Sequence, residues 1–246
     1  MLTKQNELVS LHYVVHGDGP PVVLLHGIAA SLYDWKYLLP QLSQAGFQGY
    51  APDLWGHGQS TKPDTPEVYD FNAIYTHMLS WIDDLNFNQP LFLIGHSLGG
   101  LLSLKYALNR PENVQGMVLI NPFFKPSQLS PLLRLVQRLP ELGEKALRAT
   151  PYWLIHALTG LDLNSASNDI THTRTQIASD YKRASPYIVY IAGTIPDLTK
   201  CLPEIITPTL VIREPLESQT NLAHARRGSN LATGAHERAR PNLPGG

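Results

Sequence analysis

Short apolar runs alternate with longer amphipathic stretches along the first half of the chain. Most runs are continuous rather than alternating, which is typical of strands buried on both faces of a parallel sheet. The runs lie at 11–16, 21–26, 47–52, 91–95, 116–121 and 209–212, and helical spacing occurs at roughly 31–45, 70–87 and 98–109. Strands and helices that alternate in this way predict an α/β sheet with helices on both faces.

Residues 122–203 do not follow this alternation. They open with prolines, become helical and leucine-rich, and show no strand pattern before 209–212. We interpret the block as an inserted helical cap, with additional helices on the sheet's own face as the alternative. The predicted organisation is a core at 1–121, a cap at 122–203, a core strand at 204–212 and an atypical tail at 213–246.

The tail has a different composition from the rest of the chain. From Arg213 onward it contains no valine, isoleucine or aromatic residue, and its large apolar residues are four leucines. Apolar burial cannot offset the conformational entropy of ordering such a segment. We therefore expect a mostly disordered tail with no further strand. The abrupt change at about Arg213 is typical of a frame shift or a truncation, which sequencing of the gene would test.

Composition and charge narrow the classes of function. The 246 residues are 43% hydrophobic and 16% charged, which fits one globular domain with an insertion. The formal net charge of −1 argues against nucleic-acid binding through phosphate contacts. The first residues lack the apolar core of a signal peptide, and no run approaches the roughly 18 apolar residues of a membrane span. We expect a cytoplasmic protein without membrane contact.

The sequence gives little support for a metal or a cofactor. The single cysteine, Cys201, excludes an internal disulfide and a cysteine cage, and we interpret it as a small buried residue. The glycine-rich segment at 95–100 lacks the lysine of a phosphate-binding loop. We expect no metal, no cofactor and a small-molecule substrate as partner, and the sequence leaves the oligomeric state open.

The strongest chemical signal is the segment Gly95-His96-Ser97-Leu98-Gly99, where an apolar run ends and an amphipathic helix begins. A serine on such a tight strand-to-helix turn has a strained backbone and an exposed hydroxyl, and a Cβ at either flanking glycine would collide with the neighbouring strand or helix. The helix also directs its N-terminal amides at the site. We interpret Ser97 as a nucleophile, and the alternative is a glycine-rich junction with an idle serine.

A second signal lies upstream, where a strand ends in His26-Gly27 before a loop of small residues. In such sites a loop amide and the amide that follows the nucleophile stabilise the oxyanion of the tetrahedral intermediate. We expect these donors to be the backbone N–H groups of Ile28 and Leu98. His26 itself is expected to shape the loop.

Three motifs in this order, HG at 26–27, PDLWGHGQS at 52–60 and GHSLGG at 95–100, resemble the α/β-hydrolase superfamily. More narrowly, the chain resembles its capped esterases, C–C hydrolases and haloperoxidase-like members, over about residues 9–212. The resemblance implies a mostly parallel sheet with an inserted helical lid, in which 209–212 is the seventh strand. From the composition of the tail, we expect the family's eighth strand to be missing in this chain.

The resemblance also implies roles for single residues. Asp53 and His57 belong to the turn that shapes the rim of the pocket, so we expect them to be structural. Serine at position 97 sets the chain apart from the aspartate-nucleophile members, the haloalkane dehalogenases and epoxide hydrolases. In the family the catalytic acid follows the seventh strand and the catalytic histidine comes later.

The tail departs from that family pattern. No G-x-x-D turn follows residues 209–212, and no aspartate occurs beyond Asp197. Glu214 lies nearest to the expected acid position and Glu217 is the next choice, although a glutamate in such a tail is more often a solvated charge. His236 lies at about the right distance for the base, with an idle tail histidine as the alternative, and His224 has less support.

These observations predict a serine hydrolase that cleaves an ester or a similar acyl bond of a small, largely apolar substrate through a Ser97 acyl-enzyme. Phe123 and Trp153 of the cap are candidate substrate-binding residues, although both could belong to the cap's own core. The alternative is a catalytically impaired protein that keeps the fold but lacks the triad acid and histidine. Cofactor-free lyase or perhydrolase chemistry on the same serine also stays open.

Overall fold

The computed structural model describes residues 11–129, 145, 149, 175–176 and 179–213. Contacts within the chain divide it into Met1–Arg213 and Glu214–Gly246, and all the described residues belong to the first unit. Several positions singled out in the sequence therefore lie outside the described residues, namely Trp153, Glu214, Glu217, His224 and His236. Their roles stay predictions.

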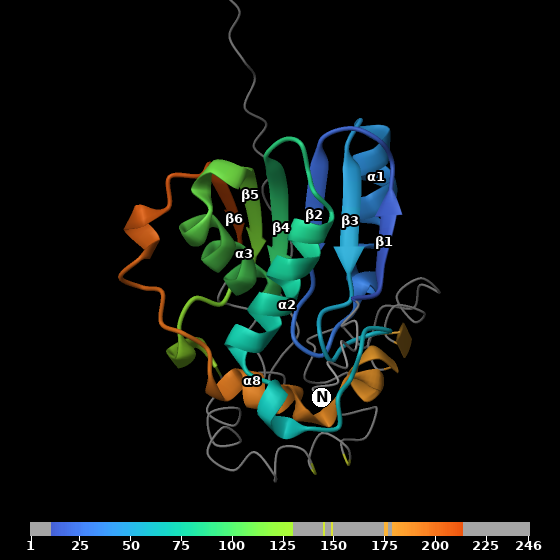
Figure 1. Ribbon diagram of the computed structural model, residues 1–246, viewed down its shortest axis with the longest axis vertical. Helices are drawn as coiled ribbons and strands as arrows, with labels where there is room; N and C mark the ends of the chain where they lie inside the picture. Colours follow the sequence, from blue (N-terminus) through green and yellow to red (C-terminus); the bar gives the residue numbers. More distant parts are fainter. Residues whose placement is uncertain (1–10, 130–144, 146–148, 150–174, 177–178, 214–246) are drawn as a thin grey trace, which may run out of the picture. The chain divides into compact units, whose positions relative to one another are not determined.

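Six strands form one sheet in the order β1-β3-β2-β4-β5-β6 (Figure 1). Their bounds are Tyr13–His16 (β1), Pro21–Leu25 (β2), Gln48–Pro52 (β3), Leu91–His96 (β4), Val114–Ile120 (β5) and Thr209–Ile212 (β6). β1 runs antiparallel to β3, and the other neighbouring pairs are parallel. Each strand overlaps the apolar run that predicted it, so the mostly parallel sheet is confirmed.

Helices cover both faces of this sheet. On β2, Val23 and Leu25 belong to the buried cluster that includes residues of α2 (Phe71–Asp84) and α3 (Leu98–Asn109). Val22 and Leu24 belong to a second cluster, with residues of α1 (Leu38–Gln44). Because successive side chains of a strand point to opposite faces, α1 lies on the face opposite α2 and α3.

Local sequence explains where these helices begin. Asp70 caps α2 by accepting a hydrogen bond from the N–H of Ala73 at 2.6 Å. The helix predicted at 31–45 is divided into a 3-10 turn at Leu32–Trp35 and α1, whose third residue is Pro40. Proline fits the first turn of a helix but not its interior, so α1 starts close to Pro40.

The described part of the predicted cap segment contacts the loops at the carboxyl ends of the strands. The N–H of Ser185 donates to the carbonyl of Gly56, and the N–H of Phe71 donates to Thr194 Oγ1, each at 2.8 Å. The helix α8 (Val189–Gly193) lies between these two contacts in sequence (Figure 1). The remaining 3-10 turns are Pro66–Val68, Pro111–Asn113, Pro126–Gln128, Pro186–Ile188 and Leu202–Glu204.

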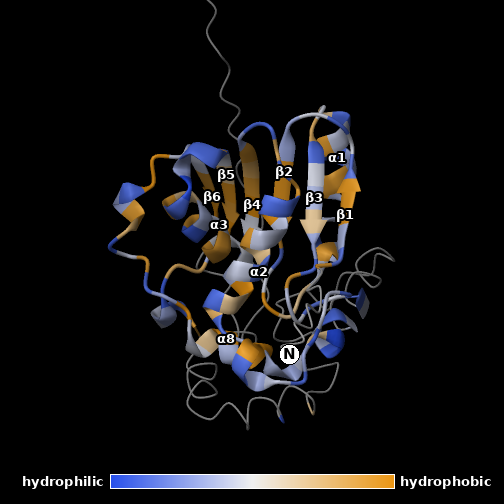
Figure 2. Cartoon of the chain, viewed as in Figure 1, coloured by the Kyte–Doolittle hydropathy of each residue, from blue (hydrophilic) through white to orange (hydrophobic). Residues whose placement is uncertain are grey.

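Strand β6 differs from the burial that its apolar run predicts. Leu210, Val211 and Ile212 are 59%, 48% and 46% exposed. β6 pairs with β5 on one side, and within the described residues no strand lies on its other side. A hollow of about 540 Å³, bordered by Phe92, Val118 and Leu210, opens on the same face as α1. Figure 2 shows the hydrophobic colouring of the strands that border it. The apolar run at 209–212 predicted the strand correctly. Its burial was predicted wrongly, because no second strand covers β6 among the described residues.

Candidate active site

Ser97 stands at the junction between β4 and α3 with a left-handed backbone, at φ 52° and ψ −110°. Such a conformation in a residue other than glycine costs on the order of 1–3 kcal/mol and persists only where its surroundings impose it. Here the N–H of Ser97 donates to the carbonyl of Ile120 at 3.0 Å. Its own carbonyl accepts from the N–H of Phe123 at 3.1 Å and of Leu101 at 3.2 Å. The end of β5 and the start of α3 together hold the serine in this conformation.

Close backbone approach explains the glycines on either side of Ser97. A Cβ on Gly95 would lie 2.4 Å from the carbonyl oxygen of Gly99. A Cβ on Gly99 would lie 2.0 Å from the carbonyl oxygen of Leu25, at the end of the neighbouring strand β2. Both distances are far below van der Waals contact, so the segment requires glycine at these two positions.

The loop that follows β2 lies against the serine. A Cβ on Gly27 would lie 3.4 Å from Ser97 Cβ, which places the peptide between Gly27 and Ile28 beside the nucleophile position. Leu98 is the first residue of α3, and the first amides of a helix lack intrahelical acceptors. Within the described residues, neither the N–H of Ile28 nor that of Leu98 donates a hydrogen bond. Both N–H groups therefore lie near Ser97 without an acceptor among the described residues.

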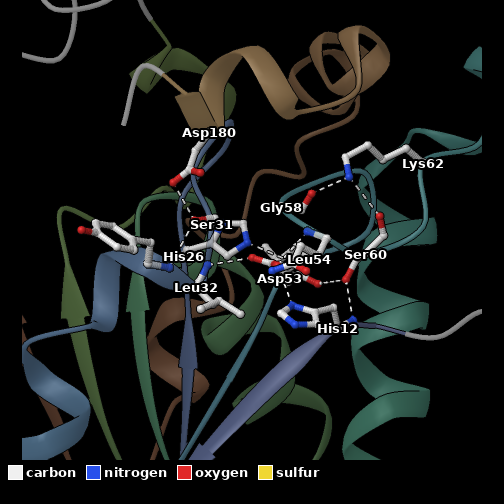
Figure 3. A network of polar contacts seen from close by, with 12 residues as sticks. His12, His26, Ser31, Leu32, Asp53, Leu54, Gly58, Ser60, Lys62 and Asp180 are labelled. Carbon is white, nitrogen blue, oxygen red and sulfur yellow. Dashed lines mark hydrogen bonds and ion pairs between the residues drawn. The ribbon is translucent and has the colours of Figure 1, made fainter. Parts of the chain in front are cut away.

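Two buried side chains brace this loop against the turn that follows β3 (Figure 3). His26 Nδ1 donates to the carbonyl of Gly27 at 2.7 Å, and His26 Nε2 accepts from the N–H of Leu54 at 2.9 Å. Asp53 accepts from the N–H of Leu32 at 2.8 Å, and from the N–H of Gln59 at the same distance. His26 and Asp53 therefore act structurally, as their sequence context predicted.

The electrostatics of these side chains follow from burial and hydrogen bonding. Burial lowers the pKa of His26, whose neutral Nδ1–H tautomer satisfies both of its partners. Burial alone would raise the pKa of Asp53, but the N–H groups of Leu32 and Gln59 and the ring of His12 outweigh it and lower that pKa. The site thus combines a neutral imidazole with a hydrogen-bonded carboxylate.

His57 is a second buried imidazole, packed edge to face against His26 with ring centroids 5.1 Å apart. Its Nδ1 donates to the carbonyl of Trp55 at 2.9 Å, and its Nε2 has no hydrogen-bond partner among the described residues. Burial, reinforced by repulsion from His26, lowers the pKa of His57 to about 3. His57 is therefore neutral at ordinary pH.

His96 differs from these imidazoles because it lies next to the nucleophile in sequence and is 40% exposed. Its Nδ1 lies 3.8 Å from Asp34 Oδ2, within ion-pair distance when the imidazole is protonated. No hydrogen bond joins the Ser97 hydroxyl to another described residue. Ser97, Ile28 and Leu98 thus lie within the part of the chain that the structure describes, whereas the predicted acid and base, Glu214 and His236, lie outside it.

A buried contact also joins this loop to the cap segment. Ser31 Oγ donates to Asp180 Oδ2 at 2.6 Å, although the two residues are 149 positions apart in the chain. Gln176 Nε2 donates to the other carboxylate oxygen at 2.8 Å. In Figure 3, Asp180 points from the segment above the loop towards Ser31.

The sequence model of a family described as alpha/beta hydrolase fold matches residues 20–184, which span the loop after β2, the nucleophile junction and part of the cap segment. This chain belongs to the α/β-hydrolase fold family. The resemblance inferred from the three motifs is therefore confirmed.

Several curated proteins share part of the sequence. The chain is 40% identical over 119 residues to bifunctional epoxide hydrolase 2 of Sus scrofa, a match that covers 48% of this chain and 21% of that protein. It is 34% identical over 120 residues to a haloalkane dehalogenase of Mycolicibacterium paratuberculosis, covering 48% of this chain and 40% of that protein. The chain therefore spans less than half the length of these relatives.

Solved structures share the fold over most of the chain. An esterase from Thermogutta terrifontis superposes with a TM-score of 0.70 at 24% identity, covering 87% of this chain and 80% of that one. A hydrolase from Pseudomonas aeruginosa PA01 superposes with a TM-score of 0.67 at 25% identity, covering 82% and 75%. The overlap shows that the fold is shared over most of the chain.

The sequence predicts the strained strand-to-helix turn at Ser97, which the structure shows, but it gives no signal for the buried carboxylate of Asp180. Ser31 had a local signal, because S-x-x-D before an apolar helix is a capping pattern, and Ser31 does cap the turn at Leu32–Trp35. Asp180 had none, since nothing in its neighbourhood indicates a partner 149 positions away. Among the described residues, no cluster of three or more metal-binding side chains occurs, and no helix is long and apolar enough to span a bilayer.

Proposed function

We propose that this α/β-hydrolase is a serine hydrolase that cleaves an ester or a similar acyl bond of a small, largely apolar substrate through an acyl-enzyme on Ser97. The observation that supports this most strongly is the left-handed Ser97 between β4 and α3, next to two amides without acceptors. A serine in this arrangement can attack a carbonyl carbon while the N–H groups of Ile28 and Leu98 receive the oxygen on which charge develops.

The proposed reaction has two halves. Ser97 Oγ bonds to the carbonyl carbon, the carbonyl electron pair moves to the oxygen, and a base removes the hydroxyl proton. The bond to the leaving alkoxide then breaks and the leaving group takes that proton, which leaves an ester on Ser97. Water repeats the attack and releases the acid. His236 as base and Glu214 as its acid partner belong to the proposal on sequence grounds alone.

The residue at position 97 distinguishes the proposed reaction from the activities for which the curated relatives are named. The relatives in pig and Mycolicibacterium are named for epoxide hydrolysis and dehalogenation. The family resemblance associates those activities with an aspartate nucleophile, whereas this chain has serine at position 97. The esterase name of one solved neighbour is in keeping with a serine, although at 24% identity that likeness shows the fold alone.

The test combines covalent labelling with turnover. A fluorophosphonate probe should label the wild-type protein and not Ser97→Ala, and p-nitrophenyl acetate should be hydrolysed by the wild type only. Loss of the nucleophile in a serine triad lowers kcat by on the order of 10⁶-fold in another serine hydrolase. Styrene oxide and 1-chlorobutane serve as control substrates, and turnover of either without probe labelling would contradict the serine mechanism.

A catalytically impaired α/β-hydrolase is the second candidate. It is favoured by one observation, namely that the Ser97 hydroxyl has no hydrogen bond to a described imidazole. A folded protein that neither reacts with the probe nor hydrolyses p-nitrophenyl acetate would establish this candidate over the first. Circular dichroism on the same sample shows whether the protein is folded.

A further inference from the structure

Asp180 is a buried carboxylate that the proposed reaction does not use. It is only 4% exposed, and its two oxygens accept hydrogen bonds from Ser31 Oγ and Gln176 Nε2 at 2.6 and 2.8 Å. No lysine, arginine or histidine forms an ion pair with it among the described residues. The carboxylate therefore relies on these two donors rather than on a cation.

Neighbouring negative charges make the Asp180 carboxylate depend more strongly on the hydrogen bonds from Ser31 and Gln176. Burial raises its pKa, the carboxylates of Asp34 and Asp53 raise it further, and the hydrogen bonds from Ser31 and Gln176 oppose the shift. Hydrogen bonds to an ionised acceptor are stronger than those between neutral groups, and leaving a buried charge without them is unfavourable. The Ser31 hydroxyl is accordingly held in one orientation.

Ser31 lies directly after the turn that carries the Ile28 amide. The N–H of Ala30 donates to the carbonyl of Gly27 at 3.3 Å, and Ala29 within the turn has a left-handed φ of 60°. An alanine in this region persists only if the flanking structure holds it. Leu32, on the far side of Ser31, is already fixed by Asp53. The contact between Asp180 and Ser31 supplies the remaining side-chain restraint at the end of the turn.

We propose that Asp180 is a positioning residue: by holding Ser31, it keeps the Gly27–Ala30 turn in shape and the N–H of Ile28 aligned with the oxyanion. Through this contact, Asp180 of the predicted cap segment sets the geometry of the Gly27–Ala30 turn. The predicted effect on reaction rate rests on the proposed serine hydrolase function. The predicted effect on the loop does not.

The test uses Asp180→Asn, Ser31→Ala and the double variant in the full-length chain. Asp197→Asn is the matched control, because Asp197 is an exposed aspartate of the same segment. Hydrogen exchange at the amides of residues 27–32 reports on the loop, and kcat and KM for p-nitrophenyl acetate report on the reaction. Thermal unfolding shows whether each variant folds, and Ser31→Ala supplies the same measurements if Asp180→Asn does not fold.

Each single variant should exchange the loop amides at least tenfold faster than the wild type. Each should also lower kcat by about tenfold with KM changed less than twofold, because a misaligned donor loses part of the roughly 10²–10³ that one oxyanion donor contributes. The double variant should be no slower than Ser31→Ala alone, because Ser31→Ala already removes the contact that Asp180→Asn weakens, together with the cap on the N–H of Tyr33. Asp197→Asn should match the wild type.

Unchanged loop exchange in Asp180→Asn and Ser31→Ala would overturn the proposal, and so would a loosened loop with unchanged kcat. Equal losses from the two single variants that simply add in the double variant would also overturn it. If the wild type hydrolyses no ester, the serine hydrolase function fails, and loop exchange alone then decides whether Asp180 positions Ser31.

Discussion

The buried His57 makes a specific prediction about stability in mild acid. Its pKa is about 3 in the folded protein, against an ordinary value of 6.5 in an unfolded chain. Between these values, the unfolded state binds one proton more than the folded state does. The stabilisation that comes from a neutral His57 is therefore fully present above pH 6.5 and is lost progressively as the pH falls.

The magnitude follows from the difference in proton binding. One full proton changes the free energy of unfolding by about 1.4 kcal/mol per pH unit. Because the unfolded-state histidine is half protonated at pH 6.5, His57 alone removes about 2.3 kcal/mol between pH 6.5 and pH 4.5. A typical domain has only 5–15 kcal/mol of total stability. His26, whose pKa burial also lowers, acts in the same direction. Acid unfolding should therefore begin well above the ordinary pKa of carboxyl groups.

The variant His57→Phe isolates this effect because it keeps an aromatic ring in the same place. It loses the hydrogen bond to the Trp55 carbonyl, so at pH 7.5 it should be less stable by about 1–3 kcal/mol. Between pH 6.5 and pH 4.5 its free energy of unfolding should fall less steeply than that of the wild type, by about 1.4 kcal/mol per pH unit. The two curves should therefore approach each other or cross.

Urea unfolding followed by tryptophan fluorescence at pH 8.5, 7.5, 6.5, 5.5 and 4.5 measures both slopes. Contributions from Asp53 and Asp180 are common to the two proteins and cancel in the difference. Above pH 7 the slopes should coincide, which serves as the internal control. Parallel curves throughout the acid range would refute the assignment of a neutral, strongly shifted His57.

Two further predictions concern the junction and the sheet edge. Gly99→Ala should prevent the protein from folding, because the new Cβ would lie 2.0 Å from the Leu25 carbonyl oxygen, whereas Gly193→Ala, with no heavy atom within 4 Å, should melt near the wild-type temperature. Normal thermal unfolding of Gly99→Ala would contradict the close approach of α3 to β2. Val211→Lys should slow aggregation in light scattering with little change in stability, since β6 has no second neighbouring strand among the described residues and a charge at such an edge opposes pairing with another strand. Equal aggregation rates would argue that this edge is not involved.

The strands and the strand-to-helix turn at Ser97 could be predicted from sequence because local pattern determines them. A continuous apolar run such as 91–95 identifies a strand, and the steric demand at Gly95 and Gly99 is met by glycine whatever lies elsewhere in the chain. The same holds for Ser97, whose strained turn has a sequence signature. Contacts between distant segments have no such signature. Asp180 could be an exposed cap carboxylate as far as its neighbours in sequence indicate, and only the folded chain brings it to Ser31.

Strand β6 shows most clearly that a sequence pattern can predict a strand without predicting its burial. In a parallel ladder, the N–H and C=O of one residue point to the same neighbour, and alternate residues point to opposite sides. The backbone carbonyls of Pro208 and Ile212 accept hydrogen bonds from the N–H groups of Met117 and Asn121 on β5. By the same alternation, the backbone groups of Leu210 also face β5. Those of Thr209 and Val211 face the other side of β6, where no strand lies among the described residues. The apolar run TLVI is typical of a strand with a neighbour on each side. The run itself does not indicate whether the second neighbouring strand is present. The burial of a strand depends on the segments that pack beside it in the sheet, so it cannot be predicted from the strand's own residues.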